Sequence, residues 1–130
     1  SIQNRSLLSV ADQFEPANSN DHTWPYYHWW PNKDKWEWIQ LDFKERQKIS
    51  KVRVYWFDDG PFGGCRIPDE FEVLYSSGGS FKKVEPNSPL TVVKDAWNVV
   101  EFTPVYATGV QLRVKLNKDF ASGIHEIVVE

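Results

Sequence analysis

The segment GVQLRVKL (residues 109–116) carries the alternation that decides the fold class. Every second residue is aliphatic, and polar or charged residues stand between them. Successive side chains of a β-strand point to opposite faces, so this pattern predicts a strand with one face in the core and the other in water. The predicted core face consists of Val110, Leu112, Val114 and Leu116.

Six further segments show short strand patterns. In KVRVYWF (51–57), Val52, Val54 and Trp56 share the predicted core face. The others are WIQLDF (38–43), EFEVLYS (70–76), LTVV (90–93), WNVVEF (97–102) and IHEIVV (124–129). Glycine and proline loops separate them, and no long stretch repeats with the 3.6-residue period of a helix. Short strands at this spacing predict an all-β sandwich or barrel.

Length and charge restrict the function classes. The 130 residues match the size of one domain, so we expect a single unit over 1–130. The chain has 15 Lys and Arg against 18 Asp and Glu, which lacks the basic excess of a nucleic-acid binder. No apolar run reaches the ~18 residues that a membrane span needs. The single cysteine, Cys65, is expected to be a small buried residue.

The segment WPYYHWWPNKDKWEW (24–38) mixes aromatic rings with loop residues, so its rings must divide between core and surface. Two adjacent large rings are rarely both exposed, so at least one of Trp29 and Trp30 is expected in the core. Trp38 and Trp56 lie in strand patterns and are also expected there, whereas Trp36 is open to either reading. The rings expected at the surface are Tyr26, Tyr27 and His28.

Two groups of carboxylates are candidates for catalysis or for ligand or metal binding. Asp58 and Asp59 are adjacent, so in an extended chain they point apart and do not form a general acid–base pair. One of them is expected to cap the turn or to pair with Arg66, an arrangement that also suits the binding of hydroxyl groups. The segment VADQFEPANSND (10–21) offers oxygen ligands for Ca²⁺, or equally a series of Asx turns.

The sequences of the predicted strands resemble those of a known family. WIQLDF, ISKVRVYWFDD, IPDEFEVLYSSGGSFKKV and the final GVQLRVKL…SGIHEIVVE resemble discoidin-like domains, also called coagulation factor V/VIII type C domains, which include the family 32 carbohydrate-binding modules. More narrowly, SNDHTWPYYHWWP and VYWFDDGPFGGCRIPDEFEVLY resemble the module appended to bacterial β-L-arabinofuranosidases of glycoside hydrolase family 127. The resemblance implies a galactose-binding-domain-like jelly-roll β-sandwich of about eight mainly antiparallel strands.

The resemblance also implies a role. It is that of a non-catalytic carbohydrate-binding module that targets an attached glycoside hydrolase to a plant or host polysaccharide, in an extracellular or periplasmic bacterial setting. The alternative is a structural β-sandwich that packs on a neighbouring catalytic domain of the parent chain and binds no sugar. The hypothesis that the chain is itself a hydrolase lacks support, because no Ser/His/Asp arrangement can be recognised in the sequence. A phospholipid-binding domain lacks support from the acidic balance and from the absence of Leu or Met spikes.

Family 32 modules bind sugars on three loops, which correspond here to 24–35, 57–67 and 117–124. By this mapping the carbohydrate-binding residues are Tyr26, Tyr27, His28, Trp30, Asp58, Asp59, Arg66 and Phe120. Asp58 and Asp59 stand where the family commonly has an arginine, so a galactose preference does not carry over. The resemblance further implies one structural Ca²⁺, with Asp12, Asn18, Asp21 and Glu126 as its ligands.

Overall fold

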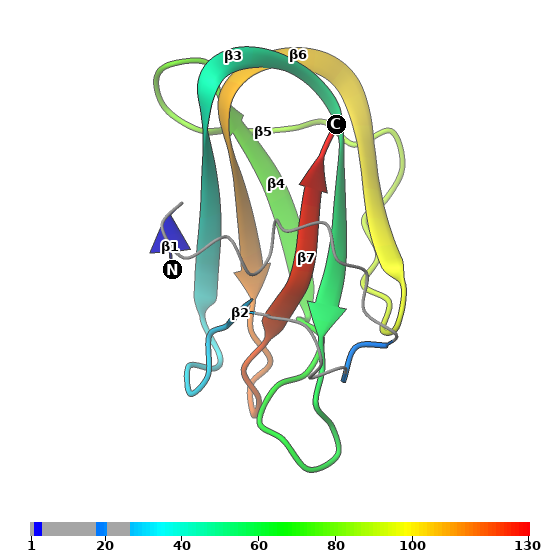
Figure 1. Cartoon of the computed structure of the whole chain (residues 1–130). Coiled ribbons are helices and arrows are strands. Elements are labelled where there is room, and N and C mark those ends of the chain that lie inside the picture. The colour runs from blue at the N-terminus through cyan, green and yellow to red at the C-terminus, as the bar shows by residue number, and fades with distance from the viewer. Residues whose placement is uncertain (1, 4–17, 21–26) are drawn as a thin grey trace.

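The computed structural model describes residues 2–3, 18–20 and 27–130, and the elements in these ranges are all β-strands (Figure 1). The strands are β1 (Ile2–Gln3), β2 (Tyr27–His28), β3 (Trp36–Phe57), β4 (Glu70–Ser76), β5 (Lys82–Lys83), β6 (Trp97–Lys115) and β7 (Gly123–Val129). Within this part of the chain no helix is long and apolar enough to cross a membrane. The prediction of an all-β fold is confirmed.

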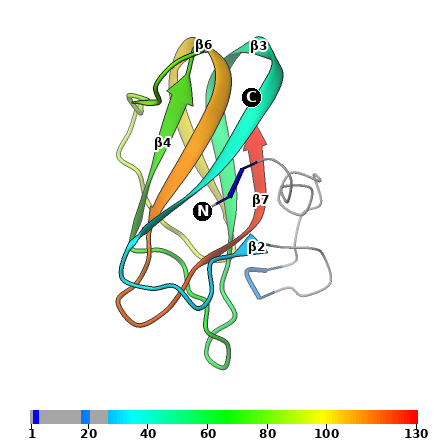
Figure 2. The ribbon, with the colours of Figure 1, turned by 90° about the vertical axis from the view of Figure 1, so that its left-hand side faces the viewer.

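The seven described strands form one sheet that folds over into two layers (Figures 1 and 2). In the first layer the beginning of β3 pairs with the end of β6, which pairs with β4, and β4 pairs with β5. In the second layer the end of β3 lies between the beginning of β6 and β7, and β2 pairs with β7. Apart from the parallel β1–β3 pair, the pairing is antiparallel.

Strands β3 and β6 each join two segments that the sequence presents as separate strands. The two pair almost throughout and arch together over one end of the sandwich (Figure 1). Their register shifts between Asp42 and Gln47 and again between Ile49 and Lys51. Extra residues in one strand bend it and increase its twist, which lets a continuous strand pass from one layer to the other.

The core lies between the layers and confirms the alternation read from the sequence. Val110, Leu112, Val114 and Leu116 are at most 1% exposed, and Trp56 is fully buried. The same register places Arg113 and Lys115 on the outer side of the first layer, where they are half-buried. Burial of each such side chain contributes roughly 1.5–3 kcal/mol.

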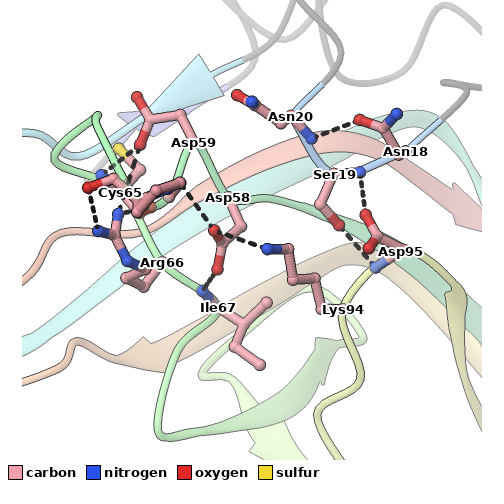
Figure 3. Close-up of polar contacts among 12 residues, drawn as sticks. Asn18, Ser19, Asn20, Asp58, Asp59, Cys65, Arg66, Ile67, Lys94 and Asp95 are labelled. Carbon is pink, nitrogen blue, oxygen red and sulfur yellow. Dashed lines mark hydrogen bonds and ion pairs between the residues drawn. The ribbon is translucent and has the colours of Figure 1, made fainter.

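The second layer is covered on its outer side by the short segment 18–20. The Ser19 backbone N–H donates to Asp95 Oδ1 (2.6 Å), and the Asp95 N–H donates to Ser19 Oγ (2.7 Å) (Figure 3). The Ser19 carbonyl oxygen accepts the Asp58 N–H (2.8 Å) and lies 2.9 Å from His125 Nε2. Ser19 is therefore fully buried, and it holds this segment against both the first loop after β3 and strand β7.

Two expectations of the sequence are wrong. Residues 90–93 form no strand. The segment instead runs to a turn at 94–96 that Asn98 holds, because its side chain accepts the Val93 N–H and donates to the Val93 and Ala96 carbonyls. Trp38 is not in the core: it pairs with Arg113 on the outer side of the first layer, since its neighbour Ile39 occupies the inner position.

Candidate functional site

Three loops meet at the end of the sandwich opposite the arch of β3 and β6 (Figures 1 and 2). They comprise residues 29–35, 58–69 and 116–122. Backbone hydrogen bonds tie them together: the Trp29 N–H donates to the Ser122 carbonyl, and the Arg66 N–H donates to the Ala121 carbonyl (both 2.9 Å). The loops that the sequence analysis singled out are therefore one connected surface.

Asp58 fixes the course of the 58–69 loop. Its carboxylate is 3% exposed and accepts the Gly60 N–H through Oδ1 and the Ile67 N–H through Oδ2, both at 3.0 Å (Figure 3). Lys94 Nζ lies 3.5 Å from Oδ1 and supplies the balancing charge. Asp58 was predicted to bind carbohydrate, but the structure uses both of its oxygens to close the loop.

Asp59 and Arg66 lock the tip of the same loop. Asp59 Oδ1 accepts the Cys65 N–H (2.7 Å), and Arg66 Nη1 lies 3.8 Å from this oxygen. The Arg66 guanidinium donates to the carbonyls of Pro61, Gly63 and Cys65. It also stacks 4.1 Å from the ring centroid of Phe120 in the third loop. The predictions that the two aspartates diverge and that one of them pairs with Arg66 are confirmed (Figure 3).

The adjacent tryptophans divide as predicted. Trp29 is 2% exposed and meets the Tyr27 ring edge to face, with centroids 5.4 Å apart. Trp30 is 59% exposed. Tyr27 is half-buried in β2, and burial, followed by the nearby charge of Glu37, raises the pKa of its phenol. Tyr27 therefore supports Trp29 beneath the loop, while Trp30 is left at the surface.

A small cavity lies under Trp30. Its volume is about 160 Å³, and its lining residues are His28, Trp30, Phe57, Asp59, Gly64 and Cys65. Phe57 and Cys65 are its buried apolar lining residues, and they pack with Ala121 in one small cluster. The expectation that Cys65 is a small buried residue is confirmed, and burial, followed by the Asp59 charge, raises the pKa of its thiol to about 12. The cavity thus combines an exposed ring, an imidazole and a carboxylate.

Gly64 allows Trp30 to lie over the loop. A Cβ atom at Gly64 would fall 2.5 Å from Trp30 Nε1 and 2.6 Å from Trp30 Cδ1. Only a residue without a side chain lets the indole approach the backbone this closely. The position of the exposed ring is therefore set by the 58–69 loop, which Asp58 and Arg66 hold in turn.

A larger cavity of about 500 Å³ opens on the other side of the loop. Its lining residues include Asp58, Arg66, Leu90 and Val92. It contains no exposed aromatic ring. The structure thus separates the predicted residues: His28, Trp30 and Asp59 share the small cavity, while Asp58 and Arg66 face the larger one.

The predicted metal ligands are placed only in part. Asp12 and Asp21 lie outside the described residues, as does Tyr26 of the predicted carbohydrate-binding set. Asn18 is exposed, and its Oδ1 accepts the Asn20 N–H (2.9 Å), as in an Asx turn. Glu126 is fully buried in β7, directly after His125, which contacts the Ser19 carbonyl. Among the described residues no three His, Cys, Asp or Glu side chains gather as a metal site.

At the loop end, the exposed ring of Phe62 escaped the sequence analysis. Phe62, at the tip of the 58–69 loop, is 99% exposed. Its signal was present, because an aromatic residue between proline and two glycines lies at a loop tip more often than in a core. The contribution of Ser19 had no such signal, since its partners Asp95 and His125 are 76 and 106 residues away in the chain.

The comparisons agree with this architecture. The model of the F5/8 type C domain matches residues 5–127. A chain of the Streptococcus pneumoniae β-galactosidase BgaA superposes with a TM-score of 0.75 at 15% identity, covering 93% of this chain and 82% of that one. The Clostridium perfringens module CpGH89CBM32-5, in complex with GalNAc-β-1,3-galactose, gives 0.59 at 17% identity, covering 85% and 76%. The Ruminococcus gnavus GH29 fucosidase E1_10125 gives 0.64 at 19%, covering 94% and 21%.

Proposed function

Because this chain belongs to the F5/8 type C domain family, we propose that it is a carbohydrate-binding module with its ligand site in the small cavity under Trp30. The observation that carries the proposal is the exposed Trp30 ring beside His28 and Asp59. A flat ring packs on the apolar face of a sugar, and fixed polar groups bind its hydroxyls. A cavity of about 160 Å³ suits a single sugar ring.

The residues around the cavity supply the required rigidity. The 58–69 loop is held by the Asp58 carboxylate and the Arg66 guanidinium, so it needs little ordering when a ligand binds. Asp59 uses Oδ1 for the Cys65 N–H, and a carboxylate has further lone pairs that accept from hydroxyl groups. Phe120 contributes through its stacking on Arg66 rather than as a lining residue.

Proteins of similar fold support a sugar ligand. One solved neighbour binds GalNAc-β-1,3-galactose, and another, at 18% identity and a TM-score of 0.57, is a pectin-binding module. We propose, further, that the module targets an attached glycoside hydrolase to its polysaccharide. The fucosidase neighbour, of which this chain covers 21%, is an enzyme in which a domain of this kind is one part. Tethering would raise the local enzyme concentration at the substrate. Family 127 as the parent enzyme and a secreted bacterial setting belong to the same proposal.

We also propose one structural Ca²⁺ held by Asp12, Asn18, Asp21 and Glu126. Two observations support it: Glu126 is a fully buried carboxylate, and Ser19, the neighbour of Asn18, is fastened to the residue before Glu126. Carboxylate oxygens are ligands that Ca²⁺ takes in proteins. An ion at this place would tie the N-terminal segment to β7. Thermal melts with added CaCl₂ and with EDTA should then differ, and identical melting temperatures would contradict the ion.

The sugar site is tested by glycan screening followed by tryptophan fluorescence titration. We expect a saturable signal with at least one glycan, and a higher Kd for that glycan in Trp30→Ala and in His28→Ala. The matched control is Tyr106→Ala, which removes another exposed ring (54%) on the arch at the far end of the sandwich and should bind normally. If no glycan loses affinity in Trp30→Ala, the cavity is refuted as the site.

The alternative, a sandwich that packs on a neighbouring catalytic domain without binding sugar, is favoured by one observation. Phe62 is 99% exposed next to the Trp30 loop, and exposed apolar side chains mark interfaces when they cluster. If a well-folded sample responds to no plant or host glycan, this alternative replaces the proposal. It then predicts that Phe62→Ser weakens association with the catalytic domain.

A further inference from the structure

A second surface with sugar-binding chemistry lies on the outer face of the first layer. Trp38 on β3 pairs with Arg113 on β6, which pairs with Glu72 on β4. Directly paired residues share a face of the sheet. Ile39, which follows Trp38, and Leu112, which precedes Arg113, are buried in the core. The row of Trp38, Arg113 and Glu72 therefore faces outward.

The polar side chains of this face are fixed by one another. Gln111 donates to Gln40 Oε1 (3.1 Å), and Arg113 Nε donates to Gln111 Oε1 (2.7 Å). Arg113 Nη1 lies 3.9 Å from Glu72, whose other oxygen is 2.8 Å from Lys83 Nζ. The groups are held before any ligand arrives, so binding costs them little side-chain entropy.

An exposed aromatic ring stands beside this row. Trp36 is 45% exposed and sits two residues before Trp38, so the two rings lie on the same face, about 6.7 Å apart along the strand. A cavity of about 350 Å³ opens beside these rings. It is lined by Trp36, Glu37, Trp38, Glu72 and Arg113. Trp38 is half-buried, so its accessible edge extends the surface of the exposed Trp36 ring along the strand.

We propose that this face is a second carbohydrate-binding site, which takes an internal stretch of a neutral linear glycan. The positive charges of Arg113 and Lys83 are offset by the two carboxylates of the cavity lining, Glu72 and Glu37, so these four residues carry no net charge that would attract an anionic ligand. Hydroxyl groups both donate and accept, which suits a surface that presents carboxylate, amide and guanidinium groups together. The site shares no lining residue with the cavity under Trp30 and does not depend on it.

The two sites differ in what they can hold. The loop-end cavity of about 160 Å³ closes around one ring, whereas the sheet face is an open strip that a chain can cross. A module with both would hold a polysaccharide at two points, and the second contact would form at the high effective concentration that the first creates.

The test is an NMR titration of the tryptophan indole N–H signals, assigned from Trp36→Ala and Trp30→Ala spectra. The probes are four neutral linear hexasaccharides: those of β-1,4-xylan, β-1,4-galactan, β-1,4-glucan and α-1,5-arabinan. In the Trp30→Ala protein we expect at least one probe to shift the Trp36 signal saturably. Trp36→Ala should weaken binding of that probe at this face about two- to twelvefold, and Tyr106→Ala should leave it unchanged.

A second variant tests the polar row without removing a ring. Arg113→Lys keeps the charge but loses the planar donors, and the same probe should bind several-fold more weakly while the urea midpoint changes little. A Trp36 signal that none of the four probes shifts overturns the proposal and leaves this face to a protein neighbour. In the same titration of the wild-type protein, shifts at Trp30 alone would overturn this proposal and leave the loop-end site standing, whereas shifts at Trp36 alone would do the reverse.

Discussion

Gly64→Ala should weaken sugar binding while leaving the fold intact. The added methyl carbon would lie 2.5 Å from Trp30 Nε1, about 1 Å closer than van der Waals contact permits. Trp30 is 59% exposed, so its ring can move outward into water. The free energy of unfolding should therefore change by less than about 0.5 kcal/mol.

Gly64→Ala should instead lower the affinity for the sugar. A displaced ring loses its stacking on the sugar, which is worth roughly 0.5–1.5 kcal/mol, or about a two- to twelvefold rise in Kd. The assay is fluorescence or calorimetric titration with the best glycan from the screen, alongside a urea melt. The matched control is Gly79→Ala, because nothing lies within 4 Å of a carbon added there.

A double variant sharpens the test. In the Trp30→Ala background, Gly64→Ala should have no further effect on affinity, because the ring that it displaces is already gone. Unchanged binding by Gly64→Ala of a glycan that Trp30→Ala binds more weakly would refute the reasoning that the loop backbone sets the position of the ring.

Three other predictions concern stability and reactivity. Asp58→Ala leaves the Gly60 and Ile67 N–H groups without their acceptor and should lower the free energy of unfolding by about 2–4 kcal/mol, measured by urea melts; a loss below about 1 kcal/mol would contradict its role as the loop clasp. Asn98→Ala should cost about 2–3 kcal/mol and speed amide exchange at Asp95, and slow exchange there would contradict the reading of the turn. Because the pKa of Cys65 rises from 9.0 to about 12 on folding, its contribution to stability is complete below pH 9 and declines as the pH rises toward 12. Cys65→Ala should flatten that decline in urea midpoints, and an unchanged slope would count against the buried thiol.

The resemblance of the strands to discoidin-like domains could be recognised from the sequence because it depends on short local motifs. The same holds for the division of Trp29 and Trp30, since two neighbouring rings on an extended chain cannot both point inward. Trp38 was misjudged for the same reason: alternation tells which residues share a face, but not which face is inside. The inner position went to Ile39, and only the pairing of β3 with β6 decided this.

The sequence by itself determined the all-β class and the core residues of the cleanest strands. These follow from side-chain alternation and turn chemistry, which act over a few residues. The three loops of the candidate site were predicted from the resemblance to family 32 modules. The tertiary structure alone decided that Asp58 closes a loop while Asp59 faces the cavity, and that Arg66 clasps the loop tip and stacks on Phe120. It also placed Trp36 and Trp38 beside a fixed polar row from β6 and β4. The physical reason is distance along the chain: these contacts join segments that meet only when β3 and β6 fold across both layers, and no local pattern encodes such a meeting.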